Sequence, residues 1–293
     1  MNAGKLISRL QAPPGKRITL AAYPTDYHDK LTKPRAGELL SRGVEQLAQQ
    51  QDLLYAQNRY ALLVIIQGLD ASGKDGIVKH VMSGLNPQGC QVTSFKAPSQ
   101  EELEHDFLWR CAKALPRRGQ IGIFNRSYYE EVLAVRVHPQ LLGRQNLPGR
   151  VLRGNIWRRR YEQINNFEQY LAQNGTEVIK LFLHISRAEQ KRRFLERIDQ
   201  PEKNWKFSRD DANERRFWPD YQRAYQDMLN ATSTPWAPWY VLPADHKWFT
   251  RLAAAEIVID RLKRLKPAYP KLSPRHRREL SQARKALEKE QVP

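Results

Sequence analysis

The chain has 293 residues, 41% of them hydrophobic, which is enough for one large or two small domains with a proper core. No apolar run approaches the roughly 20 residues that span a bilayer, and the first residues lack the apolar stretch of a secretory leader, so we expect no membrane segment. The formal net charge of +18 calls for a polyanionic partner. Charge alone leaves nucleic acid, nucleotides, membrane headgroups and inorganic polyphosphate as candidates.

The chain has two cysteines, Cys90 and Cys111, and no C-x-x-C pair. A disulfide framework or a cysteine zinc site is therefore not expected, and the composition favours a cytoplasmic protein. The seven histidines show no metal-ligand spacing either.

Short apolar runs alternate with helical segments along the chain, which predicts an α/β fold with a mainly parallel, five-stranded sheet. We predict strands at 61–67, 91–96, 121–125, 177–185 and 239–242. We predict helices at 37–57, 73–85, 100–114, 126–138, 155–174, 187–198, 211–231 and 247–263. Residues 1–36 are polar and proline-containing and are interpreted as a surface arm, 37–265 as the main domain, and 266–293 as a basic, mobile or interacting tail.

Residues 68–75 read Gly-Leu-Asp-Ala-Ser-Gly-Lys-Asp between a predicted strand and a predicted helix. This G-x-x-x-x-G-K pattern turns backbone N–H groups and a helix N-terminus toward one point, and Lys74 adds a positive charge, so it predicts a phosphate site. Two residues depart from the usual loop. Asp75 stands where Ser or Thr normally ligates magnesium, and Asp70 brings negative charge into the cradle. Such a match also occurs by chance, but the flanking strand and helix favour the functional interpretation.

A second motif begins where the predicted strand 121–125 ends. The strand ends in Asn125 where P-loop proteins often place an Asp, and Arg126 follows at the edge of the sheet where ligands bind. Glu130 and Glu131 come one turn later and can supply the missing carboxylates. The alternative is that Asn125 caps a helix and the two glutamates favour its N-terminus. That alternative does not explain an arginine beside a phosphate loop.

The segment 187–217 contains a cluster of Lys and Arg around a loop at 200–209. In a P-loop kinase such a loop is typical of a lid that closes over phosphates. The alternative is a solvated basic face. Trp205 and Phe207 weigh against it, since aromatic rings in a loop need a surface to pack on, and a nucleotide base is one candidate.

Together these motifs closely resemble the family-2 polyphosphate kinases, over most of the chain from about Pro24 to Lys263. The resemblance rests on Gly68–Gly76, Phe124–Glu131, Arg197–Phe207 and Ala237–Asp245. It implies a three-layer α/β/α P-loop fold like that of thymidylate kinase, with a helical lid. It also implies transfer of a terminal phosphoryl between inorganic polyphosphate and a nucleotide, with Mg²⁺ or alternatively Mn²⁺. The Asn125 form of the second motif resembles the subclass that acts on both AMP and ADP.

The resemblance also implies roles for individual residues. The catalytic positions are Asp70, Lys74, Arg126, Glu130 and Glu131, with Asp70 and one of the two glutamates holding the metal. The phosphate-binding positions are Gly68, Ala71, Ser72, Gly73, Lys74, Asp75, Asn125, Arg126, Arg136, Arg193, Arg197, Lys206 and Lys247. The nucleotide-binding positions are Trp205, Phe207 and Arg209. The implied partners are polyphosphate and AMP, ADP or ATP, with GDP as a further candidate, and the implied assembly is a homodimer or homotetramer.

Two other functions share some of these features. An ATP-dependent nucleoside-monophosphate kinase has the same loop and lid, but it has no need for Asp75 or for a broad basic surface. A nucleic-acid-binding P-loop protein explains the net charge equally well. The chain carries no nucleic-acid module signature, so nucleic acid is the less favoured partner.

Overall fold

Five parallel strands form one sheet at the centre of the protein. The computed structural model describes residues 2–290. The strands are β1 (Ala61–Gln67), β2 (Cys90–Ser94), β3 (Ile121–Asn125), β4 (Thr176–His184) and β5 (Trp239–Pro243), in the spatial order β2-β3-β1-β4-β5. Each neighbouring pair is parallel. All of β1 is buried, as expected for a central strand covered on both faces. The predicted five-stranded sheet is confirmed.

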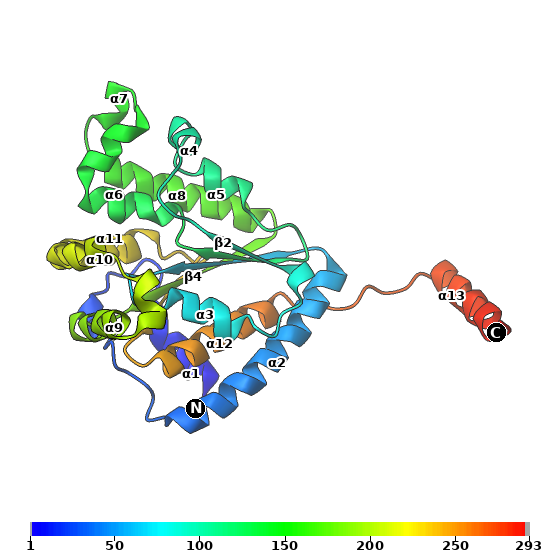
Figure 1. Ribbon diagram of the computed structural model, residues 1–293. Coiled ribbons are helices and arrows are strands. Elements are labelled where there is room, and N and C mark those ends of the chain that lie inside the picture. The colour runs from blue at the N-terminus through cyan, green and yellow to red at the C-terminus, as the bar shows by residue number, and fades with distance from the viewer. Residues whose placement is uncertain (1, 291–293) are drawn as a thin grey trace.

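Helices cover both faces of this sheet and complete three layers (Figure 1). One face packs on α1 (Ala3–Leu10), α2 (Lys33–Gln57), α3 (Lys74–Val81) and α12 (Lys247–Arg264). The other face packs on α5 (Trp109–Lys113), α8 (Ile156–Gln173) and α11 (Trp218–Thr232). A separate buried hydrophobic cluster fills each interface, so the predicted α/β/α class is confirmed.

The N-terminal segment is not the surface arm that its composition predicts. Leu6, Ile7 and Leu10 of α1 are buried in the core, because their spacing puts them on one side of the helix. Beyond α1, Gln11 pairs with Tyr240 in an antiparallel bridge and covers the outer edge of β5. The main domain therefore includes residues before position 37.

Two predicted helices are each divided in two. The segment 100–114 forms α4 (Gln100–Glu104) and α5, because the backbone is extended at His105. The segment 126–138 forms the 3₁₀ helix η3 (Tyr128–Val132) and the short helix α6 (Ala134–Val137). Arg126 has φ +65° and Ser127 is extended, so a regular helix cannot begin at the strand end.

The predicted lid region consists of α9 (Arg187–Asp199), η5 (Pro201–Lys206), α10 (Arg209–Glu214) and η6 (Arg215–Phe217). The remaining elements are η1 (Leu20–Ala22), η2 (Pro87–Gly89), η4 (Pro139–Gln145), α7 (Gly149–Leu152) and α13 (Pro274–Leu287). Figure 1 shows α13 set apart from the three layers. Over residues 2–290, the structure contains no helix that is both long and apolar enough to cross a membrane.

Candidate active site

The loop 68–75 connects β1 to α3 at the carboxyl end of the central strand. A Cβ at Gly68 would lie 2.7 Å from Ser72 Oγ and 3.0 Å from the Leu183 carbonyl oxygen, so only glycine fits there. Gly73 has φ +110°, which other residues rarely adopt, and it precedes the first helical residue, Lys74. The loop thus has the shape that the sequence motif predicts.

Lys74 is bound to the loop that precedes it. Its Nζ donates to the carbonyl oxygens of Gly68 (2.7 Å) and Leu69 (3.2 Å), and the side chain is buried. Burial lowers the pKa of this ammonium, and the negative charge of Asp70 opposes the shift. Its charge therefore lies beneath the loop, where phosphate oxygens would meet it.

Two buried oxygen atoms at the loop lack a hydrogen-bond partner within the part of the chain that the structure describes. They are Ser72 Oγ and Asn125 Oδ1. Asn125 uses its Nδ2 to donate to Asp75 Oδ1 at 2.9 Å, so two of the residues that depart from the usual P-loop pattern contact each other. Orphaned buried polar atoms are costly. A phosphate oxygen could accept from the Ser72 hydroxyl, whereas Asn125 Oδ1 needs a metal ion or a donor such as water.

Arg126 and Asp70 form an ion pair above the loop, with Nη2 and Oδ1 2.7 Å apart. Burial by itself raises the pKa of the Asp70 carboxyl, but the charges of Lys74 and Arg126 outweigh it and bring the pKa below its ordinary value. Glu130 and Asp70 stabilise the charged guanidinium in turn. Both groups are therefore charged at neutral pH and are held next to the loop.

An open cleft of about 700 Å³, here called the phosphate cleft, runs over the loop and under the lid. Its cationic lining residues are Lys74, Lys96, Arg126, Arg193, Arg197, Lys203, Lys206, Lys247 and Arg251, and its acidic ones are Asp70, Asp75, Glu196 and Asp211. The excess of positive charge suits a chain of phosphates. Of the cations, Lys96, Lys203 and Arg251 were missed as site residues. Lys96 follows a strand at the carboxyl edge of the sheet, a signal that could have identified it.

Arg193 has a different role from the one predicted for it. Its guanidinium donates to four carbonyl oxygens, those of Ala71 (2.8 Å), Ser72 (3.0 Å), Ala244 (2.6 Å) and Asp245 (3.1 Å). Its Nε donates to Glu189 at 2.7 Å. Because an arginine has five N–H donors, none remains for a phosphate. Arg193 instead joins the lid helix α9 to the phosphate loop and to the loop after β5.

The structure separates the two candidate carboxylates, Glu130 and Glu131. Glu131 is buried and accepts from Arg160 Nε (3.0 Å) and Gln145 Nε2 (2.8 Å), away from the phosphate cleft. Burial raises the pKa of Glu131, and Arg160 opposes the shift. Glu130 instead lines two cavities beside Arg126. Glu131 also lines one of these cavities, but both of its carboxylate oxygens already accept from Arg160 and Gln145. Glu130, which lines both cavities, is therefore the better placed of the pair to contact a ligand.

Arg136 also lies away from the phosphate cleft. It donates to the Tyr161 hydroxyl (2.6 Å) and to Asp227 (2.5 Å), contacts that tie α6 to α8 and α11. The phosphate contact predicted for Arg136 is not supported by this position.

The three lid residues predicted to bind the nucleotide do not form one surface. Trp205 is 78% exposed and lines the phosphate cleft, with Lys206 Nζ 4.8 Å from its ring centroid. Phe207 packs edge-on against Phe194 at 5.8 Å. Arg209 is exposed, and neither it nor Phe207 lines any of the cavities found around the site.

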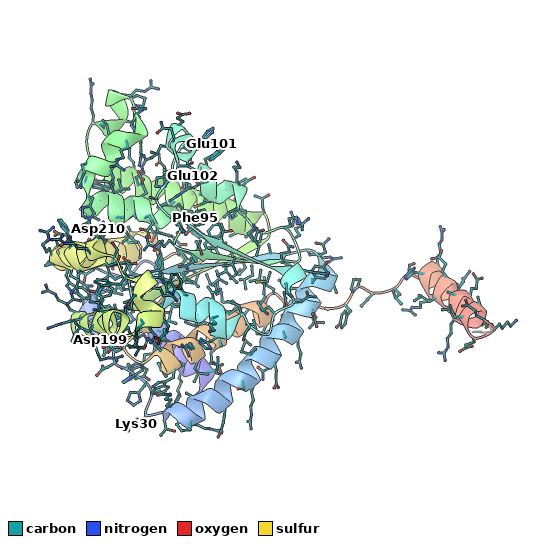
Figure 2. All side chains as sticks on the ribbon, viewed as in Figure 1. Lys30, Phe95, Glu101, Glu102, Asp199 and Asp210 are labelled. Carbon is teal, nitrogen blue, oxygen red and sulfur yellow. The ribbon has the colours of Figure 1, made fainter. Side chains whose placement is uncertain are left out.

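Two smaller cavities adjoin the phosphate cleft. The aromatic pocket, about 270 Å³, lies between η3, α6 and the segment after β2, and its lining includes Phe95, Phe107, Tyr128, Leu141 and Glu102. Figure 2 labels Phe95, just after β2, and Glu102 on α4, and both residues line this pocket. The lid pocket, about 250 Å³, lies between the loop and α10–α11, and its lining includes His138, Glu214, Trp218, Tyr221 and Tyr225. Arg126 lines all three cavities.

The carboxylates near Arg126 fit a magnesium ion that is held largely by substrate. Within residues 2–290, the structure shows no cluster of three His, Cys, Asp or Glu side chains able to hold a metal. Magnesium usually takes only one or two protein carboxylates and fills its other positions with phosphate oxygens and water. Asp70, Glu130 and the free Oδ1 of Asn125 offer oxygen atoms of this kind around the loop.

These features agree with the comparison to known proteins. A family model described as Polyphosphate kinase 2 (PPK2) matches residues 30–270. The chain belongs to the polyphosphate kinase 2 family. It is 50% identical over 275 residues to the ADP-polyphosphate phosphotransferase of Rhodopseudomonas palustris, covering 93% of this chain and 95% of that protein. It is 44% identical over 232 residues to the AMP/ADP-polyphosphate phosphotransferase of Meiothermus ruber, covering 79% and 82%.

Solved polyphosphate kinase 2 structures share the fold. The crystal structure of polyphosphate kinase 2 from Arthrobacter aurescens TC1 has a TM-score of 0.83 and 39% identity, covering 93% of this chain and 94% of that one. The family predicted from the four motifs is therefore confirmed.

Proposed function

We propose that the protein transfers the terminal phosphoryl group of inorganic polyphosphate to ADP and AMP, reversibly, giving ATP and ADP. The observation that carries this proposal is the meeting of the phosphate cleft and the aromatic pocket at Arg126. A donor in one cavity and an acceptor in the other would bring their phosphates together beside the loop. The relatives named as ADP- and AMP/ADP-polyphosphate phosphotransferases support this choice of acceptors.

Polyphosphate would occupy the phosphate cleft. The cleft is open and predominantly cationic, as a linear chain of phosphates of variable length requires. The backbone N–H groups of the loop and Lys74 would hold the reacting end, and Arg197, Lys206 and Lys247 would contact the units that follow. An ATP donor would need an apolar site for its base on this side of the loop. The aromatic side chains that line the cleft are the exposed Trp205 and Phe95, which is buried and also lines the aromatic pocket.

The acceptor base would occupy the aromatic pocket in place of the lid site predicted from Trp205, Phe207 and Arg209. Phe95 and Phe107 supply apolar surface, and Glu102 and Asp106 supply acceptors for an exocyclic amine. Arg126 and Glu130, at the inner end of this pocket, would then meet the nucleotide phosphates.

The chain's own residues would act by position and charge. The acceptor phosphate is already ionised, so no general base is required, and in-line transfer between phosphate oxygens asks for alignment and charge stabilisation. Arg126 and Lys74 would stabilise the negative charge of the transferring group. Bound Mg²⁺, for which Mn²⁺ is the alternative, would neutralise phosphate oxygens, with Asp70 and Glu130 orienting it. Closure of the lid, residues 187–217, would exclude water.

A coupled assay tests the proposal. ADP with long-chain polyphosphate and Mg²⁺ should yield ATP with no other phosphoryl donor present. AMP and GDP, each tested separately with polyphosphate, define the acceptor range, and we expect turnover of AMP. Failure to form ATP or ADP under these conditions, with activity on AMP plus ATP, would identify an ATP-dependent nucleoside-monophosphate kinase.

We further propose a cytoplasmic homodimer or homotetramer, from the cysteine content and the family resemblance. Sedimentation of the purified protein tests the assembly, and a monomer at assay concentrations would contradict it.

A further inference from the structure

Helix α13 has no packing partner in the part of the chain that the structure describes. Every residue from 268 to 290 is exposed. The side-chain hydrogen bonds and ion pairs of α13 all have both partners within the segment 273–288. The family match ends at residue 270, so this segment lies outside the shared domain. Packing within the chain therefore does not explain its sequence.

This segment has more basic than acidic residues, and part of this excess lies on one side of α13. Residues 266–290 contain eight Lys and Arg but only three acidic residues. Two of these acidic residues are paired within the helix, Glu279 with Arg275 at 2.8 Å and Glu288 with Arg284 at 2.7 Å. The cations outside these pairs include Arg277, Arg278 and Lys285. At 3.6 residues per turn these three fall within about 100° of one another, and they form a cationic stripe.

The rest of the helix surface favours a simple polyanion over a membrane or a single-stranded nucleic acid as the partner. Opposite the cationic stripe lie Leu280, Ala283 and Leu287 together with His276 and Glu279, with no Trp or Phe to anchor the helix in a bilayer. The helix contains no Phe, Tyr or Trp ring on which single-stranded nucleic acids stack, and its one imidazole, His276, lies against Glu279 at 3.3 Å. The remaining feature of the helix is the cationic stripe, which would recognise a partner by its negative charge.

We propose that α13 is a second binding site for the polyphosphate donor, which holds the distal part of a chain whose end lies in the phosphate cleft. This inference rests on the proposed function. It adds that the enzyme distinguishes long donor chains from short ones by a site outside the catalytic domain.

Helix α12 sets the distance between the two sites. Lys247, at its start, lines the phosphate cleft, and the linker to α13 leaves from its other end at Arg264. An 18-residue helix is about 27 Å long, so a chain must extend roughly that far to reach both sites. The linker 265–273 can itself span up to about 30 Å, although its prolines stiffen it.

Two sites on one chain act through effective concentration. A donor bound at α13 raises the local concentration of phosphate at the cleft, and this gain is lost when the chain is too short to span the sites. The apparent affinity for long chains should therefore exceed that for short ones, and the difference should shrink as salt screens the exposed charges.

The test uses the full-length triple variant R277Q/R278Q/K285Q, with ADP as acceptor. We expect its KM for long-chain polyphosphate to rise at least about fivefold, because the tethering gain is lost. The KM for a short linear polyphosphate such as the hexaphosphate, the KM for ADP and kcat should stay as in the unmodified enzyme. Deletion of residues 271–293 should reproduce this pattern.

The matched control is R275Q/E279Q, which removes one cation and one anion from the same helix and leaves its net charge unchanged. It should behave like the unmodified enzyme. An unchanged KM for long chains in the triple variant, or an equal rise for long and short chains, would overturn the proposal. A change in sedimentation on deletion without a change in KM would also overturn it and assign α13 to a second copy of the chain. If no donor of any length yields ATP, the proposed function itself fails.

Discussion

Arg126 is the residue at which the cavities of the site meet. It pairs with Asp70, adopts φ +65° directly after β3, and lines all three cavities. A planar guanidinium can contact oxygens of donor and acceptor together, which a lysine ammonium cannot do in the same geometry.

The first prediction concerns this geometry. Arg126→Lys should lower kcat at least about tenfold, which corresponds to an increase of about 1.4 kcal/mol or more in the activation free energy. The positive charge remains in this variant, but the paired N–H donors of the planar guanidinium are lost. Initial-rate kinetics of ATP formation measures it. Arg192→Lys on exposed α9, which lines none of the three cavities, is the control and should leave kcat unchanged.

The second prediction separates Glu130 from Glu131. Glu130→Gln should lower kcat at least about tenfold with little change in stability, as should Asp70→Asn. Glu131→Gln should instead destabilise the fold by about 3 kcal/mol, because it leaves Arg160 buried without its charge partner. Denaturant unfolding and kcat, measured on the same preparations, distinguish the two. A Glu131→Gln enzyme that is stable but inactive would contradict this prediction and show that Glu131 takes part in catalysis.

At the scale of elements, the lid helix α9 is joined to the phosphate loop. Arg193 links the helix to both neighbouring loops, and Gln190 Nε2 donates to the Asp70 carbonyl at 3.0 Å. Within the proposed lid 187–217, we therefore expect closure to move mainly the part after α9, which includes η5 and α10.

The third prediction tests this connection. Arg193→Met should lower the melting temperature and raise the KM for polyphosphate, because four loop carbonyls lose their donor and the cradle loosens. Its neighbour Arg192 is 61% exposed and pairs with the same Glu189, so Arg192→Met is the matched control. Equal stability of the two variants in thermal unfolding would contradict the role given to Arg193.

The elements also show what local pattern could and could not predict. Strand, glycine loop and helix at 61–81 were predicted because each depends on neighbouring residues: an apolar run, Gly68, Gly73 and a helical repeat. The segment after β3 was predicted as one helix because its composition allows it. Its actual path depends on the backbone at Arg126 and on Tyr128 and Tyr129, whose hydroxyls both donate to buried Glu168, forty and thirty-nine residues away. Such contacts leave no periodic signal.

At the scale of the whole molecule, the proposed function divides the site into a donor side and an acceptor side. Most residues of the donor side were predicted, because the loop and the lid are compact motifs. The pocket proposed for the acceptor was not predicted from the sequence. Its aromatic pocket combines residues after β2, near α5, in η3 and in η4, and no single segment shows the pattern.

The most direct test of this division is the KM for ADP and for polyphosphate, measured by initial rates on Phe107→Ala, Trp205→Ala and Lys247→Gln. We expect Phe107→Ala to raise the KM for ADP at least about tenfold, from the loss of base packing, with little change in the KM for polyphosphate. Lys247→Gln should raise only the KM for polyphosphate, and Trp205→Ala should leave the KM for ADP unchanged. A raised KM for ADP in Trp205→Ala, with a normal value in Phe107→Ala, would contradict the account and place the base in the lid.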